Sequence, residues 1–249
     1  MEVAKAQQKK LNILDSGEEF FSDLFEQISS AKDYILIKQF LWRNDRAGRD
    51  IAKKLLESME RGVKVVVLKD RIGAFHEYGE RAGQSFFHDA PLEDSPFSTH
   101  SLSTVYAQAN LLLSKFYSNG VSPQKKNPLR NQFVEHPNST VIDQYKLYDH
   151  SKVIIIDGET AYVGGIGFAD DFSEDDDKWS DYMIRIDDNT AVNDLLRVLA
   201  GEKVESIDPT SEKFHAGHNL HPHILSKILG SRKELLIEMP FLGNPAYID

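Results

Sequence analysis

The sequence predicts an α/β protein in which a mixed β-sheet is flanked by helices on both faces. Three observations support this prediction. A strand–helix–strand pattern fills residues 34–68, and such a crossover implies parallel pairing of its two strands. A continuous apolar run at 153–156 leads through an Asp-Gly pair into a β-forming segment at 160–163, which indicates an antiparallel hairpin. Apolar residues recur at helical spacing over 17–31 and 191–199.

The first helix is expected at 17–31, where the apolar positions fall on one face. Ser16 is a suitable N-cap, and glutamates in the first turn suit the positive end of the helix dipole. A strand follows at 34–37 and runs on toward Trp42. The first helix therefore directly precedes the first strand of the predicted sheet.

The second helix is expected at 51–61, with Gly62 at its C-terminal end. The next strand covers 63–68 and completes the strand–helix–strand unit. After the hairpin, residues 179–186 predict one more strand, and the helix at 191–199 follows it.

An insertion at about 76–139 interrupts the regular pattern. Residues 79–104 are rich in Gly, Ser, Pro, Asp and His, which indicates loop, and 123–128 are loop again. Between them, 105–117 show the spacing of an amphipathic helix. A stretch this long inside a domain is commonly functional. Two interpretations of the helix stay open: it covers a cleft or touches lipid, or it packs on the core.

The composition narrows the functional classes. The chain has 249 residues and no cysteine, which excludes disulfides and thiolate metal sites. Its net charge of −10 disfavours nucleic acid as a partner, because nucleic-acid-binding proteins commonly present a basic face. No apolar run approaches the length of a membrane span, and the N-terminus lacks the apolar core of a signal peptide.

The most specific chemical pattern lies at 148–158. His150 and Lys152 stand two residues apart, so their side chains point to the same side of a strand. This arrangement suits attack on an anionic phosphorus centre, with the imidazole as nucleophile and the ammonium holding the phosphate charge. Asp157 has the opposite parity and, with Gly158, is expected to form a two-residue hairpin turn. From these residues alone, an ordinary strand with a polar start and a turn aspartate stays open.

Two further clusters have alternative interpretations. The acidic run from Asp170 to Asp177 has the composition of a cation site but lacks EF-hand spacing, so a solvated acidic loop is expected. The histidines between His215 and His223 suggest zinc, but no predicted element fixes their spacing, so a linker or loop is expected. No metal or other cofactor is therefore expected.

The C-terminal tail resembles the start of the chain. Residues 231–238 resemble residues 31–38, and a similar apolar helix precedes each segment. We therefore expect one domain at 1–205, followed at 206–249 by a linker and the first helix and strand of a truncated second repeat. The alternative is a chance similarity between two amphipathic helix–strand units.

The pattern His-x-Lys-x4-Asp, followed after six residues by Gly164-Gly165, resembles the HKD signature of the phospholipase D superfamily. Residues 17–21, 40–45 and 179–181 are similar to the cardiolipin synthase branch of that superfamily. The resemblance implies the α-β-α sandwich of the superfamily.

The resemblance also implies roles for four residues. His150 is expected to form a phosphohistidine intermediate, and Lys152 is expected to bind the phosphate. Asp157 matches the third signature residue, for which a structural role at the hairpin turn is the preferred interpretation. Asp181 matches an acidic residue that hydrogen-bonds the nucleophilic imidazole and so fixes its tautomer.

Two departures from the family pattern matter. Gly164, Gly165 and Gly167 are expected to border the substrate, but Gly167 stands where the family usually has asparagine. The family also uses two HKD motifs, and the second histidine protonates the leaving oxygen. This chain has one motif. The second half is expected from a missing C-terminal region, which the repeated tail favours, or from a homodimer partner.

The expected function is phosphatidyl transfer or phosphodiester hydrolysis on phospholipids, through a phosphohistidine, as in cardiolipin synthases. The expected location is the cytoplasm, with peripheral contact to the membrane that holds the phospholipid substrate. One alternative is a nuclease of the same superfamily, which the net charge of −10 disfavours. Another is a non-catalytic phosphate-binding or interaction module with a lone HKD motif.

Overall fold

In the computed structural model the chain divides into two compact units, Met1–Asn189 and Thr190–Asp249. The structure describes residues 10–70, 73–79, 84–88, 127–144, 149–173, 179–200 and 220–236.

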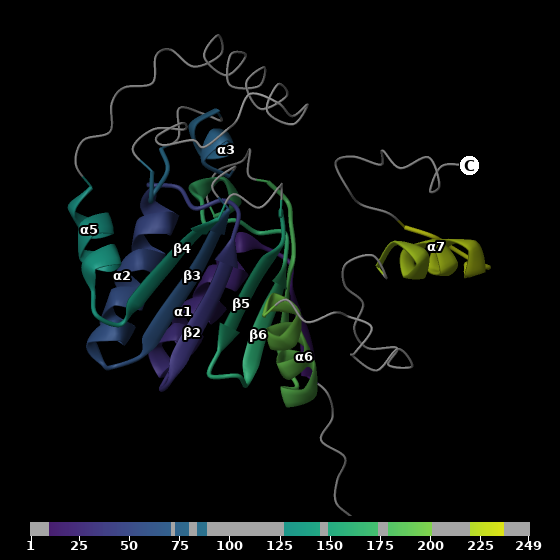
Figure 1. Ribbon diagram of the computed structural model, residues 1–249. Helices are drawn as coiled ribbons and strands as arrows, with labels where there is room; N and C mark the ends of the chain where they lie inside the picture. The colour runs from purple at the N-terminus through teal and green to yellow at the C-terminus, as the bar shows by residue number, and fades with distance from the viewer. Residues whose placement is uncertain are drawn as a thin grey trace, which may run out of the picture. The chain divides into compact units, whose positions relative to one another are not determined.

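The first unit is built around a seven-stranded sheet, part of which is labelled in Figure 1. Its strand order is β1-β7-β6-β5-β2-β3-β4. Strands β2, β3 and β4 pair in parallel, and the other neighbours pair antiparallel. The predicted α/β class with a mixed sheet is therefore confirmed. The strands are β1 Lys10–Leu14, β2 Tyr34–Gln39, β3 Lys64–Asp70, β4 Ser139–Gln144, β5 Lys152–Ile156, β6 Thr160–Gly164 and β7 Met183–Asp187.

The two predicted helices of the first unit are present. Helix α1, Gly17–Ser30, is capped by Ser16, whose hydroxyl accepts the Glu19 N–H at 3.2 Å. Helix α2, Arg46–Glu60, connects the parallel strands β2 and β3. It begins earlier than the predicted Ile51 because Asp45 accepts the Gly48 N–H at 3.0 Å and so caps the helix.

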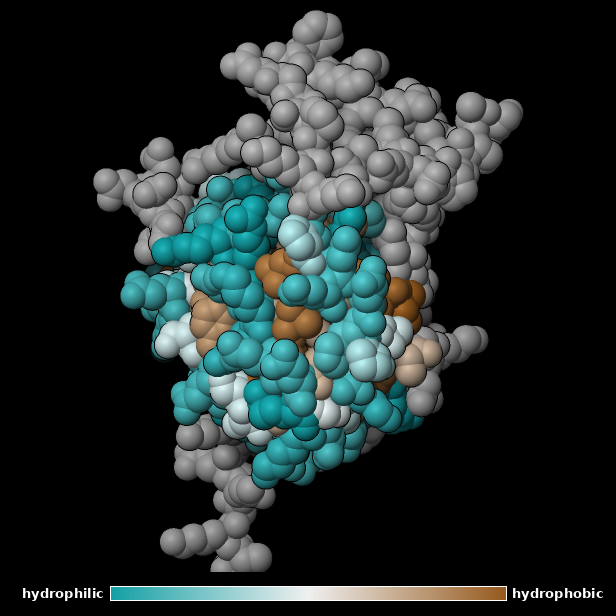
Figure 2. Space-filling model, turned by 90° about the vertical axis from the view of Figure 1, so that its left-hand side faces the viewer, coloured by the Kyte–Doolittle hydropathy of each residue, from teal (hydrophilic) through white to brown (hydrophobic). Residues whose placement is uncertain are grey.

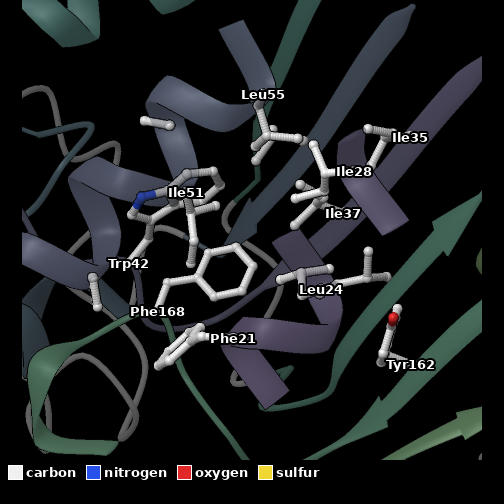
Figure 3. Close-up of a cluster of buried hydrophobic side chains, with 14 of the residues drawn as sticks. Phe21, Leu24, Ile28, Ile35, Ile37, Trp42, Ile51, Leu55, Tyr162 and Phe168 are labelled. Atoms are coloured by element: carbon white, nitrogen blue, oxygen red, sulfur yellow. The ribbon is translucent and has the colours of Figure 1, made fainter. Parts of the chain in front are cut away.

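The hydrophobic core lies where α1 and α2 pack on one face of the sheet (Figure 3). Strand β2 alternates in burial along its length, so every second side chain points into this core. Trp42 is fully buried among aromatic rings, including Phe168 at 4.8 Å between centroids. The side chains labelled in Figure 3 are Phe21, Leu24, Ile28, Ile35, Ile37, Trp42, Ile51, Leu55, Tyr162 and Phe168.

The turn between β5 and β6 is one residue longer than the predicted two-residue turn. Ile156 pairs with Thr160, so the turn spans residues 157–159. Asp157 and Gly158 both have positive φ angles, 54° and 69°. Thr160 is held in the paired position because its hydroxyl donates to Asp187 at 2.8 Å.

The strand predicted at 179–186 begins only at Met183. The residues before it take part in other contacts. The Trp179 N–H donates to the Asp171 carbonyl at 2.8 Å, and the Trp179 ring packs edge-on against Phe172. Trp179 is therefore held against residues 171–172, whereas the Tyr182 carbonyl still accepts the Gly165 N–H at 2.9 Å just before β7 begins.

The start of the acidic run is not the solvated loop that the sequence predicts. Asp170 accepts the N–H groups of Arg46 and Ala47 at 3.1 and 2.7 Å, and so neutralises the start of α2. Asp171 is buried and pairs with Arg43. Residues 174–178 of the run lie outside the described part of the chain.

Part of the insertion is described. Helix α3, Gly73–Gly79, follows β3, and α5, Pro128–Glu135, precedes β4. The amphipathic helix predicted at 105–117 lies outside the described residues. Figure 2 shows the side of the unit where α5 lies, and its surface is mainly hydrophilic with small hydrophobic areas.

The second unit contains α6, Asn189–Leu199, which begins at the unit boundary, and α7, Leu220–Gly230. Residues 231–236 form no strand, and the rest of the strand predicted at 231–238 lies outside the described residues. His215 and His218 also lie outside the described residues, whereas His221 and His223 lie on α7 and not in the predicted linker or loop. In the described ranges, no three acidic or histidine side chains are grouped to hold a metal ion. None of the described helices has the length and apolar character needed to cross a bilayer.

Candidate active site

The candidate site lies at one end of the sheet, where the parallel strands β2 and β3 finish. Across the antiparallel half, Lys152 pairs with Gly164, and Gly164 pairs with Met183. The start of β5, the end of β6 and the start of β7 therefore meet at this end. Ligand sites in open α/β sheets commonly lie beyond the carboxyl ends of the parallel strands.

His150 and Lys152 contact each other, as their spacing predicts. The Lys152 Nζ lies 3.3 Å from the His150 Nδ1 and donates to the His150 carbonyl at 3.0 Å. Lys152 is 3% exposed, whereas His150 is exposed. Both side chains contact the ring of Phe40. The His150 ring meets it edge-on, with 4.5 Å between the ring centroids, and the Lys152 Nζ lies 5.8 Å from its centroid. A buried ammonium thus lies beside an accessible imidazole.

The pKa of His150 is lowered to about 4, chiefly because partial burial of the ring disfavours its charged form. The positive charges of Lys152 and His76 contribute to this shift, and the carboxylates of Asp181 and Asp149 oppose it. At neutral pH this imidazole is uncharged and keeps a lone pair for attack.

Burial also lowers the pKa of Lys152, to about 8, with Asp181 opposing the shift and Lys69 reinforcing it. Most of the lysine is therefore charged at pH 7, as phosphate binding requires.

The negative charge of Asp181 influences the titration of His150 and Lys152. It raises the pKa of both His150 and Lys152. Its Oδ1 accepts the Tyr182 N–H at 2.8 Å, and the contacts recorded for the described residues include no hydrogen bond between Asp181 and His150. The hydrogen bond expected from the family resemblance stays a prediction.

The glycines differ in their surroundings. A Cβ on Gly165 would lie 2.0 Å from the Asp181 Oδ1, and one on Gly164 would lie 2.1 Å from the Tyr182 carbonyl oxygen. Because Gly165 has no side chain, the Asp181 carboxylate can occupy the space beside it. Gly167 is buried against Leu41 and Phe172 instead. The substrate contacts expected of all three glycines stay predictions.

Replacing Gly165 with alanine is expected to displace the Asp181 carboxylate, because the two groups cannot share the space. The pKa of His150 and that of Lys152 should both fall, since Asp181 raises each of them. Phosphodiester turnover should drop by about 10- to 100-fold, the order expected for a misplaced catalytic group. Gly230→Ala is the control, because nothing lies within 4 Å of a Cβ there. Equal turnover in both variants would contradict this role of Gly165.

Asp157 has the contacts of a turn residue. Lys152 begins β5, and Asp157 directly follows the last residue of that strand. The two residues are therefore roughly 16 Å apart along the extended strand. Its carboxylate accepts the backbone N–H groups of Lys32, Asp33 and Tyr34 at 2.9 to 3.0 Å. These bonds tie the hairpin to the segment between α1 and β2.

Replacing Asp157 with alanine is expected to lower the free energy of unfolding by about 2–3 kcal/mol, through lost charged hydrogen bonds and an alanine at positive φ. Asp157→Asn should lose less, because one acceptor oxygen remains and asparagine tolerates this backbone conformation. Urea unfolding measures both values. An alanine variant that is as stable as the wild type, yet inactive, would show that the aspartate serves the chemistry instead.

Sequence reasoning missed Asp149, which holds the backbone beside His150. Its carboxylate pairs with Lys38 and accepts the Ser151 N–H at 3.2 Å, and its own N–H donates to Asp70 at 3.0 Å. Burial raises the pKa of Asp149, but the hydrogen bonds from Lys38 and Ser151 outweigh it and lower the pKa.

His76 on α3 was missed too. Its ring lies 5.4 Å from the ring of Phe40, the same ring that His150 contacts. The insertion in which it lies has no periodic pattern that would place it. Asp149, by contrast, adjoins the motif, and that position was a usable signal.

Comparisons with known proteins identify the family of the chain. The family model "Cardiolipin synthase, PLD-like domain" matches residues 24–200. A cardiolipin synthase of Staphylococcus aureus is 30% identical over 181 residues, which cover 71% of this chain and 28% of that protein. One from Geobacillus kaustophilus is 24% identical over 160 residues, which cover 64% of this chain and 24% of that protein.

Two solved structures are similar at lower identity. NucT from Helicobacter pylori has a TM-score of 0.46 and 15% identity, covering 78% of this chain and 95% of that chain. The phosphatidylserine synthase of Haemophilus influenzae has a TM-score of 0.47 and 16% identity, covering 76% of this chain and 36% of that chain.

The chain spans about a quarter of the length of the curated relatives that it matches. The family match covers well over half of the chain, and it includes strands β2 to β7 and every residue of the candidate site. The chain therefore belongs to the family of cardiolipin synthase PLD-like domains of the phospholipase D superfamily.

Proposed function

We propose that the chain transfers a phosphatidyl group through His150. The imidazole nitrogen attacks the phosphorus of a phospholipid phosphodiester, a P–N bond forms, and the P–O bond to the headgroup alcohol breaks. An acceptor hydroxyl, from another lipid's glycerol or from water, then attacks the phosphorus and releases the imidazole, and its proton passes to the group that protonated the leaving alcohol. The observation that supports this most is an uncharged, accessible imidazole with a buried ammonium 3.3 Å away.

Lys152 serves as the phosphate-binding cation in this proposal. Its burial removes competing water, so the attraction between the ammonium and a phosphate oxygen is stronger than it would be in bulk solvent. Charge that develops on the phosphate oxygens during attack meets a cation that is already in place.

The alcohol that leaves must take up a proton, and the family supplies it from a second HKD histidine. We propose that a second half, in a longer chain or in a second copy, provides that group. The relative lengths of the proteins support this proposal, because the matched residues cover only 24% to 28% of the two cardiolipin synthases. Substrate would be taken from the membrane surface on its cytoplasmic side.

Labelled phosphatidylglycerol vesicles test this function. We expect label to appear in cardiolipin or in phosphatidic acid, which thin-layer chromatography separates, and the ratio between them tells transfer from hydrolysis. Parallel incubation with single- and double-stranded DNA tests the nuclease alternative. Lipid binding without either product would favour a phosphate-binding module, and DNA cleavage without lipid products would favour a nuclease. Sedimentation of the same sample shows whether a second copy is present.

A further inference from the structure

A fully buried ion pair lies next to the candidate site. The Lys69 Nζ, at the end of β3, is 2.9 Å from the Glu77 Oε1 on α3, and both side chains are 0% exposed. Buried ion pairs are weak contributors to stability, because the desolvation of both charges offsets their attraction. A hydrophobic pair of similar volume often stabilises a core equally well. Stability alone therefore gives a poor account of this pair.

The pair is bonded to the backbone that follows β2. The Lys69 ammonium donates to the carbonyl of Phe40 at 2.5 Å and to that of Asp70 at 3.0 Å. The Glu77 Oε1 also accepts the Trp42 N–H at 2.6 Å. Gly73, at the start of α3, allows the close approach, because a Cβ there would lie 1.8 Å from the Phe40 carbonyl oxygen. These contacts fix residues 40–42 against β3 and α3.

Phe40 connects this fixed backbone segment to the candidate site. Its ring is 1% exposed and meets His150 edge-on at 4.5 Å, with the Lys152 Nζ 5.8 Å from its centre. His76, adjacent to Glu77 on α3, meets the same ring at 5.4 Å. A shift of the Phe40 backbone would therefore move the surface on which the nucleophile and the phosphate-binding cation rest.

We propose that Lys69 and Glu77 are positioning residues of the active site: their ion pair fixes Phe40 beneath His150 and Lys152, and the Lys69 charge acts on Lys152. The kinetic part of this proposal rests on the proposed function, whereas its electrostatic part does not.

Each of the two reacting groups has several charged or titratable neighbours. Lys152 faces Asp181, Lys69 and His150. His150 faces Lys152, His76, Asp181 and Asp149. The Lys69 charge lowers the pKa of Lys152, so removal of that charge must raise it. A pair that only filled space in the core would leave the titration of Lys152 unchanged.

The double variant Lys69→Met, Glu77→Gln tests the proposal. Methionine matches the volume of the lysine stem, and glutamine keeps an oxygen acceptor for the Trp42 N–H. The first readout is the titration of Lys152 by NMR, with carbon-13 at the lysine Cε and Lys152→Met used to assign the resonance. The second is the rate at which the enzyme is labelled by a phosphodiester. Thermal unfolding is followed on the same samples.

A control variant removes a less buried ion pair elsewhere, whose side chains are 19% and 22% exposed. Arg185→Met, Asp23→Asn breaks the pair between β7 and α1, whose atoms are 2.9 Å apart, and neither residue contacts Phe40 among the recorded ring and hydrogen-bond contacts. Lys69→Met alone is the second test variant if the double variant does not fold, because a buried glutamate can take up a proton and become neutral.

We expect the Lys152 titration to move to higher pH in the Lys69 variants, although these also neutralise Glu77, because Lys69 is among the charges that act on Lys152 and Glu77 is not. The titration should stay unchanged in the control. The labelling rate should fall by about 10- to 100-fold in the Lys69 variants, as misplaced catalytic groups cause, and should stay near the wild-type value in the control. An unchanged Lys152 titration, or a labelling rate in the Lys69 variants equal to that of a wild-type protein that is labelled, overturns the proposal. A wild-type protein that is never labelled, with the titration shift present, overturns the proposed function and leaves the electrostatic effect standing.

Discussion

Replacing His150 with asparagine is expected to abolish turnover, with a loss of about 10⁴-fold or more in kcat, as for other covalent nucleophiles. Asparagine keeps a polar side chain of similar size but cannot form a stable bond to phosphorus. The position is exposed and precedes β5, so folding should be retained. Phosphodiester turnover and thermal unfolding, measured on the same sample, separate the two effects.

His136→Asn is the matched control for His150→Asn. His136 ends α5 and precedes β4, whose first residue, Ser139, pairs with Val65 at the start of β3. It therefore lies at the opposite end of the sheet from the candidate site. Activity that survives in the His150 variant, at wild-type stability, would contradict the nucleophile assignment.

Replacing Lys152 with methionine is expected to lower kcat/KM by about 10²- to 10³-fold, the order measured when a preorganised charge-stabilising group is removed. Methionine fills the buried space of the lysine stem, so the loss reports the charge. The Lys152 side chain is nearly inaccessible to solvent, and burying a charge is costly. Because methionine removes that charge, we expect no large loss of stability.

The pH profile gives a second measurement of the same residue. Lys152 must be protonated, so kcat/KM should fall as pH rises through its pKa of about 8. His150 must be unprotonated, so kcat/KM should fall as pH drops through its pKa of about 4. The plateau therefore lies between these values, because kcat/KM reports the free enzyme. Lys152→Met should lose the basic limb, and a basic limb that persists unchanged would assign it to another group.

The parts of the fold with strong periodicity could be predicted from the sequence. The apolar run of β5 and the amphipathic pattern of α1 are both where they were expected. Strand β4 and helix α5 were missed, because each has few buried apolar side chains to produce a pattern; in α5 only Phe133 is buried. Their position depends on tertiary packing against the parallel strands.

The site was predicted in part. The HKD spacing correctly predicted contact between His150 and Lys152. His150 lies just before β5, which begins at Lys152, so alternation along a strand does not by itself fix their relation. The Lys69–Glu77 pair was missed, since it joins a strand to a helix in the irregular insertion. One signal was present: Lys69 is in phase with the buried Val65 and Val67, so alternation places it on the inward face.

The covalent intermediate tests the central claim most directly. The protein is mixed with phosphatidylglycerol, quenched at alkaline pH to preserve a P–N bond, digested and analysed by mass spectrometry. We predict a phosphatidyl group on the peptide that contains His150, at the imidazole, and its absence in His150→Asn. A wild-type protein that turns over substrate with no modified His150 peptide, or with the group on another residue, would contradict the account.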